Sequence, residues 1–187
     1  MLRIGDVRVH HVEEWQGNFL PPSVFFVGYD EATFRSFAPG LTPQYYRDDA
    51  DSIYAFLQSW ILEVDGLRVL YDTGAGNAKE RPGIPLFGGL DTPYLTRMAA
   101  AGFAPDDIDV VICSHLHIDH VGWNTRLHEG RWLPTFPNAR YIVQRGEWVY
   151  ATHTNERTAG SYFPPNFAPL VAAVADQPDA PAAAARL

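Results

Sequence analysis

The chain has 187 residues, 47% of them hydrophobic, a formal net charge of −8 and one cysteine, Cys113. This length suits one domain or part of a larger one, and the acidic balance disfavours nucleic-acid binding, which needs a basic face. A single cysteine excludes an intrachain disulfide. The N-terminus lacks a signal core and no stretch reads as a bilayer span, so we expect a cytoplasmic protein without membrane contact.

The first predicted element is a β-hairpin over residues 2–15, with a tight turn at Gly5-Asp6. His10 and His11 are adjacent within it, and neighbouring strand residues point to opposite faces. The two histidines therefore cannot both serve one site. We interpret them as partly exposed strand residues.

Residues 17–51 contain several prolines and many aromatic side chains. Because proline interrupts both helices and strands, we predict an irregular segment here. The aromatic side chains either cover the sheet or line a ligand site, and the sequence favours neither interpretation.

A long strand is predicted over residues 52–64, followed by an Asp65-Gly66 turn and a returning strand over residues 67–71. Apolar residues occupy both faces of the long strand, which predicts an interior strand covered on both sides. The returning strand ends at Asp72.

A loop over residues 77–90 precedes a predicted helix that has Thr92 as N-cap and Pro93 at its first position, and that Gly102 ends. Further elements are predicted downstream: a small hairpin around Glu129-Gly130 with an exposed His128, a strand over 139–144, and helices over 145–153 and 166–175.

Potential metal ligands crowd the segment that follows the short apolar run Val110–Cys113, which reads as a buried strand. They are His115, His117, Asp119 and His120. Imidazole and carboxylate groups are ligands that borderline divalent metals prefer, and α/β proteins place their sites at the C-terminal ends of strands.

The spacing of these residues predicts two metal positions. Residues two apart in an extended turn point the same way, so His115 and His117 suit one ion. Asp119 and His120 come from the following bend and suit a second ion. The alternative is a polar loop whose histidines only form hydrogen bonds. We interpret Cys113 as a small buried hydrophobic residue, with a ligand role as its alternative.

The pattern H-x-H-x-D-H resembles the metal motif of the metallo-β-lactamase superfamily. Asp72-Thr73-Gly74, Ala101-Gly102-Phe103 and Val121-Gly122-Trp123-Asn124 extend the resemblance over about residues 1–170, toward the branch of quorum-quenching lactonases and methyl-parathion-hydrolase-like enzymes. The resemblance implies an α/β (α+β) fold, the N-terminal half of an αββα sandwich, with a mixed sheet and flanking helices.

The resemblance also implies a metal-dependent hydrolase that opens a lactone or related ester through a metal-activated hydroxide; a phosphotriester or β-lactam substrate is compatible with the same chemistry. It implies two divalent ions, zinc first, with manganese, iron or cobalt as alternatives. His115 and His117 would hold one ion, and Asp119 and His120 the other. Asp119 would also orient the nucleophile. Asp72 would act from outside the ligand set by orienting a histidine, or would simply accept backbone hydrogen bonds in its turn. The aromatic side chains of residues 17–51 would form an apolar wall for the substrate.

The sequence departs from the family pattern after His120. Only His128 and His153 follow, and neither lies in a family-like ligand turn, although His153 remains a candidate. We therefore expect a truncated domain over residues 1–171, with an Ala/Pro-rich disordered tail over 172–187. An uncovered apolar sheet would promote self-association. Two alternatives follow: a non-catalytic metal-binding remnant, or an iron-dependent oxidoreductase on the same fold.

Overall fold

The structure is a computed structural model that describes residues 1–81 and 84–150. The chain divides into two compact units. Among the described residues, the main unit comprises Met1–Glu14 and the chain that follows Leu57, and the second unit comprises Trp15–Leu57. The predicted helix over 166–175, the domain boundary at 171, the tail and His153 lie outside the described residues.

A mixed β-sheet organises the structure, as the sequence predicted. Its strand order is β1-β2-β4-β5-β6-β9, and β3 pairs with β4 off this path. The strands are β1 (Leu2–Ile4), β2 (Val7–Asn18), β3 (Tyr46–Arg47), β4 (Ser52–Val64), β5 (Leu67–Tyr71), β6 (Val110–Cys113) and β9 (Arg140–Val143). Strands β4 and β5 are antiparallel, whereas β5, β6 and β9 run parallel. Because parallel strands end at the same edge of a sheet, the residues that follow β5 and β6 are brought together.

The turn between β4 and β5 sets the register of the sheet. Asp65 and Gly66 both have positive φ, 50° and 79°, as a tight hairpin requires, and Val64 pairs with Leu67. The predicted bounds of both strands and of this turn are confirmed. The N-terminal hairpin of β1 and β2 is confirmed as well.

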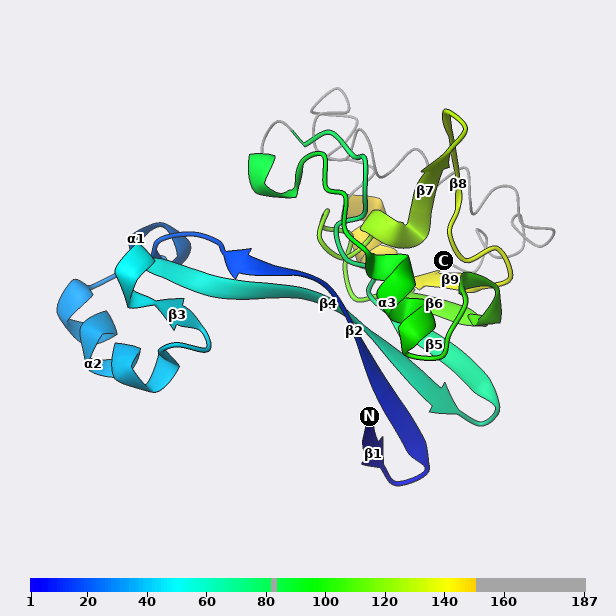
Figure 1. Ribbon diagram of the computed structural model, residues 1–187, viewed down its shortest axis with the longest axis horizontal. Coiled ribbons are helices and arrows are strands. Elements are labelled where there is room, and N and C mark those ends of the chain that lie inside the picture. Colours follow the sequence, from blue (N-terminus) through cyan, green and yellow to red (C-terminus); the bar gives the residue numbers. More distant parts are fainter. Residues whose placement is uncertain (82–83, 151–187) are drawn as a thin grey trace. The chain divides into compact units, whose positions relative to one another are not determined.

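One face of the main-unit sheet carries the hydrophobic core. The helix α3 (Tyr94–Ala100) lies on the sheet (Figure 1), and its Tyr94 and Met98 are fully buried in one hydrophobic cluster with Leu70 and Val111. This helix begins two residues later than Thr92, so the predicted N-cap is wrong. The backbone N–H and the hydroxyl of Thr92 both donate to Asn77 Oδ1, at 2.8 and 3.1 Å, and this contact replaces the cap.

The opposite face of the same sheet presents an apolar row to solvent. The register aligns Trp60 with Tyr71, Tyr71 with Ile112, and Ile112 with Ile142. Trp60, Tyr71 and Ile142 are 38%, 39% and 41% exposed. Strand β4 is interior to the sheet, between β2 and β5, but the prediction that both of its faces are covered is wrong. We call Trp60, Tyr71, Ile112 and Ile142 the apolar row.

The second unit contains helices where an irregular segment was predicted. They are α1 (Pro22–Phe25), α2 (Glu31–Leu41) and a 3₁₀ turn, η1 (Asp48–Ala50). Asp30 caps α2 by accepting a hydrogen bond from Thr33 N at 2.8 Å. Pro22 occupies the first turn of α1, where its missing N–H costs nothing, and Pro39 falls in the last turn of α2.

The aromatic side chains of the second unit divide into two groups. Phe34 and Tyr46 pack edge-to-face with ring centroids 5.0 Å apart and form a small core with Ala38. Others are largely exposed, among them Phe25, Phe26, Phe37 and Tyr45. Part of the aromatic content therefore serves this unit's own core, a role that was not predicted from the sequence. The apolar wall for a substrate stays a prediction.

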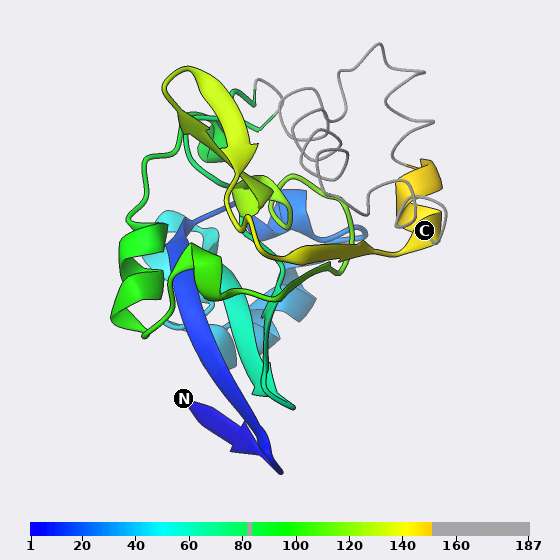
Figure 2. The same cartoon turned by 90° about the vertical axis from the view of Figure 1, so that its right-hand side faces the viewer.

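The last part of the described chain agrees with the sequence analysis. Strands β7 (Thr125–His128) and β8 (Arg131–Pro134) form the predicted hairpin, which projects away from the sheet (Figure 2). Three further 3₁₀ turns are η2 (Pro85–Phe87), η3 (Pro105–Asp107) and η4 (Gly122–Asn124). A helix begins at residue 145 and is described to residue 150. Across the described residues, no helix is long and apolar enough to cross a membrane.

Candidate metal centre

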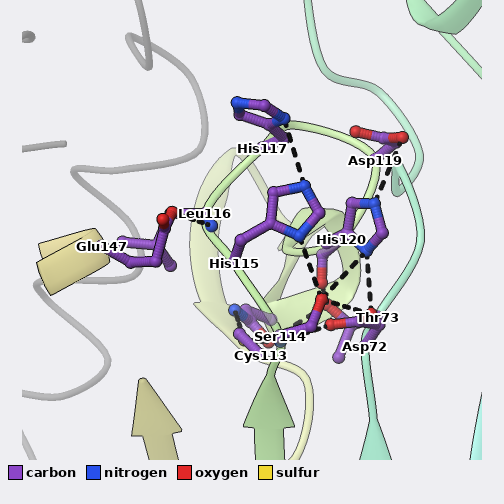
Figure 3. A network of polar contacts seen from close by, with 11 residues as sticks. Asp72, Thr73, Cys113, Ser114, His115, Leu116, His117, Asp119, His120 and Glu147 are labelled. Carbon is purple, nitrogen blue, oxygen red and sulfur yellow. Dashed lines mark hydrogen bonds and ion pairs between the residues drawn. The ribbon is translucent and has the colours of Figure 1, made fainter. Parts of the chain in front are cut away.

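The ends of β5 and β6 bring Asp72 beside the loop that carries the predicted ligands (Figure 3). Asp72 N donates to Ile112 O at 2.9 Å, and Thr73 N donates to His120 O at 2.8 Å. The parallel pairing of the two strands places these segments at one edge of the sheet. We call residues 114–120 the ligand loop.

Asp72 anchors the ligand loop through both of its carboxylate oxygens. Oδ1 accepts from Ser114 N at 2.7 Å, and Oδ2 accepts from Ser114 Oγ at 2.8 Å and pairs with His120 Nδ1 at 2.8 Å. Burial acts to raise the pKa of Asp72, but hydrogen bonds from His120 and Ser114 outweigh it and hold the pKa below its usual value. The residue has φ +54°, in the left-handed region. The carboxylate is therefore ionised and points into the loop.

His120 lies between two carboxylates. Its Nδ1 contacts Asp72, and its Nε2 lies 3.4 Å from Asp119 Oδ2. Burial acts to lower the pKa of His120, but Asp119 and Asp72 raise it to about 9. Burial also acts to raise the pKa of Asp119, which the His120 contact nevertheless keeps low. The bond to Asp72 thus leaves Nε2 and the Asp119 carboxylate facing each other.

His115 and His117 form a second pair of donors. His115 Nε2 lies 3.1 Å from His117 Nδ1, and the rings of His115 and His120 have centroids 4.0 Å apart. The pKa of His115 is lowered, first by burial and then by the neighbouring histidines. The side chains of His115 and His117, two positions apart in the loop, therefore point to the same side and bring two ring nitrogens close together, as their spacing predicted.

The distances within both pairs fit a divalent ion. Two donors about 2.0–2.1 Å from a tetrahedral zinc are about 3.3 Å apart. The His115–His117 separation of 3.1 Å and the Asp119–His120 separation of 3.4 Å lie close to this value. Within residues 1–81 and 84–150, no three His, Cys, Asp or Glu side chains converge on one point. Each position thus has two protein donors in the described chain, and the metal-binding role stays a prediction.

Cys113 faces away from the ligand loop. It is 2% exposed, and its sulfur accepts a hydrogen bond from Asn124 Nδ2 at 3.4 Å. Burial raises the pKa of the thiol to about 12. The interpretation as a buried hydrophobic residue is confirmed.

The other histidines lie elsewhere. His10 Nε2 contacts Glu63 Oε1 at 2.8 Å, and His11 packs against Trp60 on the opposite face, as expected for adjacent strand residues. His128 is exposed on β7, as predicted. These three histidines thus lie on strands β2 and β7 and have no role in the candidate metal centre.

Buried charged residues near the site were not predicted from the sequence. Glu14, Lys79 and Arg81 are 1%, 0% and 6% exposed. Glu147 Oε2 accepts a hydrogen bond from Leu116 N at 3.2 Å, on the side of the loop away from Asp72 (Figure 3). For Glu14 a signal existed, since it shares the inward face of β2 with the buried Val12. No local pattern distinguishes Lys79 and Arg81 from solvent-exposed loop residues.

Comparison with known proteins agrees with this geometry. The family model described as "Metallo-beta-lactamase superfamily" matches residues 56–179. The chain belongs to the metallo-β-lactamase superfamily. The match includes β5, β6 and the whole ligand loop, and the α/β fold with a mixed sheet is the one that the resemblance implied.

Curated proteins similar to part of this chain include N-acyl homoserine lactonases. The N-acyl homoserine lactonase AttM of Agrobacterium fabrum is 38% identical over 77 residues, which are 41% of this chain and 26% of that protein. The N-acyl homoserine lactonase AiiA of Bacillus thuringiensis subsp. kurstaki is 42% identical over 55 residues, 29% of this chain and 18% of that protein. The chain therefore matches about a quarter or less of these relatives' length, and the predicted resemblance to the lactonase branch is confirmed.

Solved structures share the fold at low sequence identity. A probable metal-dependent hydrolase from Staphylococcus aureus superposes with a TM-score of 0.68 at 22% identity, covering 88% of this chain and 56% of that one. AidC, a dizinc quorum-quenching lactonase, superposes with a TM-score of 0.61 at 20% identity, covering 80% and 45%. The chain thus spans about half the length of these structures, in keeping with half of the αββα fold.

Proposed function

We propose that this chain provides the first half of the metal centre of a hydrolase that opens lactones or related esters. The observation that carries the proposal is the pairing of donors in the ligand loop, His115 with His117 and Asp119 with His120, at separations that suit ligands of one ion each. The family membership and the lactonase relatives support it.

In this proposal each residue has a defined task. His115 and His117 hold one ion, and Asp119 and His120 hold the other. Asp72 accepts a hydrogen bond from His120 Nδ1, so that Nε2 is the ring nitrogen left to face a metal. Because the two carboxylates raise the pKa of His120 to about 9, metal binding at Nε2 would release a proton at neutral pH. Asp72 thus fixes both the tautomer and the ring orientation of His120, and the same carboxylate orders Ser114 at the start of the loop.

The ions themselves, which we propose to be zinc, would when bound act as Lewis acids that lower the pKa of a water molecule and polarise the substrate carbonyl. Asp119 would accept a hydrogen bond from the attacking water and so direct its lone pair at the carbonyl carbon. A lactone substrate is proposed because the sequence relatives are N-acyl homoserine lactonases.

One observation favours a second candidate, a metal-binding remnant without catalytic activity. A catalytic zinc site usually has three protein ligands and one open position, whereas the described chain offers two donors to each ion. Both candidates share the metal centre and differ in whether a complete donor set is assembled.

A complementation assay separates these candidates. The 187-residue chain is produced alone and together with the C-terminal part of a lactonase relative, loaded with zinc or manganese, and tested for lactone opening with and without a chelator. We expect little opening by the chain alone and chelator-sensitive opening by the complemented pair. His117→Ala should abolish it, and the exposed control His128→Ala should not. A folded, zinc-loaded pair that does not hydrolyse the lactone would support the non-catalytic metal-binding remnant. Oxygen consumption by an iron-loaded sample would instead support an iron-dependent oxidoreductase.

A further inference from the structure

Two buried charged side chains, Glu14 and Arg81, hold the turn that follows Asp72. We call this turn, residues 73–76, the Ala75 turn. The carboxylate of Glu14 accepts from Ala75 N at 2.6 Å through Oε2 and from Gly76 N at 2.7 Å through Oε1. Oε1 also accepts from Trp123 Nε1 at 2.7 Å. The approach is so close that a Cβ on Gly74 would lie 2.1 Å from Glu14 Oε2. The turn therefore has no freedom to move toward β2.

Arg81 binds the carbonyl side of the same turn and reaches the ligand loop. Its Nη2 donates to the carbonyl of Ala75 and, at 3.1 Å, to the carbonyl of Ile118. Its Nη1 donates to Phe87 O at 2.9 Å. Ile118 lies between His117 and Asp119, one proposed ligand of each ion. One guanidinium thus connects the Ala75 turn to the middle of the ligand loop.

The charges support this arrangement. Burial lowers the pKa of Arg81 to about 10, while the carboxylates of Glu14 and Asp119 oppose the shift, so the guanidinium keeps its charge at neutral pH. Hydrogen bonds from a charged donor are worth roughly twice as much as neutral ones. A planar guanidinium can also bond to several carbonyl groups at once, which an ammonium on a shorter chain does less well.

We propose that Arg81 is a positioning residue for the metal centre, which fixes the ligand loop to the Ala75 turn in the absence of metal so that His117 and Asp119 are held ready for binding. The effect on metal binding rests on the proposed function. The bridge that Arg81 forms between Ala75 and Ile118, which we call the clamp, is present in the metal-free chain. Glu14 holds the other side of the turn, so that Arg81 pulls the loop toward a fixed point.

Amide hydrogen exchange of the metal-free, full-length chain tests the clamp directly. Arg81→Met should accelerate exchange at the amides of Thr73, which donates to His120 O, and Gly122, which donates to Gly74 O, because these bonds join the turn to the chain around the ligand loop. It should also accelerate exchange at the amide of His120, which donates to His117 O within the loop. The expected factor is about 10- to 100-fold, the opening that corresponds to loss of a hydrogen bond to a charged group. Exchange at Leu70 and Val111 in the sheet should change little, and the matched control Arg126→Met, at an exposed arginine of β7, should change neither set.

A second variant, Arg81→Lys, distinguishes the geometry of the guanidinium group from its positive charge. It also serves as the test if Arg81→Met does not fold. Arg81→Lys retains the positive charge but not the guanidinium, and we expect loop exchange between that of the wild type and that of Arg81→Met. Exchange equal to wild type in Arg81→Lys would overturn the proposed bridge. Equal acceleration of loop and sheet amides would also overturn it, since that result describes a general loss of stability.

Zinc affinity, measured by competition with a chromophoric chelator, gives the functional readout. In a variant that remains folded, Arg81→Met should weaken zinc binding by about 10- to 100-fold, the range for partners that orient metal ligands. If the wild-type chain binds no zinc, the proposed function fails while the exchange data still decide the clamp. If zinc binds equally to the wild type and to Arg81→Met, the positioning role is wrong and the proposed function stands.

Discussion

Asp72 and His120 lie 48 residues apart in the chain, yet the carboxylate Oδ2 of Asp72 and the ring Nδ1 of His120 are 2.8 Å apart. The parallel pairing of β5 and β6 creates this contact, because the two strands end at the same edge. The contact fixes one ring nitrogen of His120 as the donor and leaves the other beside Asp119. The arrangement of the candidate metal centre thus follows from the order of the strands.

The first prediction concerns this contact. Asp72→Asn should keep the fold but weaken the orientation of His120, because the amide is neutral and can present N–H where the ring needs an acceptor. We expect zinc affinity to fall by about 10- to 100-fold, and Asp119→Ala, which removes a proposed ligand, to lose more. A chelator competition titration measures both. Unchanged zinc affinity in Asp72→Asn would show that Asp72 only accepts backbone hydrogen bonds and does not orient His120.

The second prediction concerns pH and the buried Lys79. Its Nζ donates to Thr125 Oγ1 at 2.9 Å and lies 3.7 Å from the centre of the Trp132 ring. Burial lowers the pKa of Lys79 to about 7. In the unfolded chain the amine stays protonated up to its ordinary pKa, so the unfolded state binds more protons above pH 7. The free energy of unfolding should therefore rise with pH above this point.

The measurement is urea unfolding of the wild type and of Lys79→Met between about pH 6.5 and 8.5, a window that spans the lowered pKa of Lys79 and stays below the ordinary pKa of a lysine. We expect the wild type to gain about 1–2 kcal/mol relative to Lys79→Met across this window. Lys79→Met should be the more stable protein at the acidic end, where the wild type buries a charge. A constant difference between the two proteins would show that Lys79 does not titrate there.

The third prediction concerns the apolar row on the uncovered sheet face. Trp60, Tyr71 and Ile142 present apolar surface to solvent, and such patches promote association. We expect the chain to self-associate with increasing concentration in sedimentation velocity, and the double variant Trp60→Gln/Ile142→Gln to shift it toward monomer. Leu127→Gln, at an exposed position of β7, is the matched control. A compact wild-type monomer at every concentration would contradict this prediction.

The fourth prediction concerns the core beneath α3. Met98 is fully buried against the sheet, so Met98→Ala removes apolar contacts and leaves a cavity. The free energy of unfolding should fall by about 2–5 kcal/mol. Thr96→Ala, at an exposed position of the same helix, should change it by less than about 0.5 kcal/mol. Equal effects in urea unfolding would show that α3 does not pack as described.

Local signals in the sequence were sufficient for part of the fold. The bounds of β4 and β5 were predictable because Asp65-Gly66 fixes a two-residue turn, and the ligand loop was predictable because its ligands are close in sequence. Long-range contacts account for the errors. Thr92 satisfies Asn77 instead of capping α3, and Arg81 acquires its role only when folding brings Ile118 to it. The residue pattern of β4 alone predicted that both of its faces are covered, whereas the expectation of an exposed apolar sheet came from the incomplete resemblance to the family, and Trp60 is exposed.

The most direct test of the metal centre is the zinc content of the purified 187-residue chain after equilibration with micromolar zinc and removal of the excess. We predict that the folded wild-type chain retains zinc, up to two ions per chain, and that His115→Ala and His120→Ala each reduce this content. His10→Ala, on a strand away from the ligand loop, should retain the wild-type content. A folded wild-type chain without bound zinc, or equal content in all of these proteins, would contradict the account.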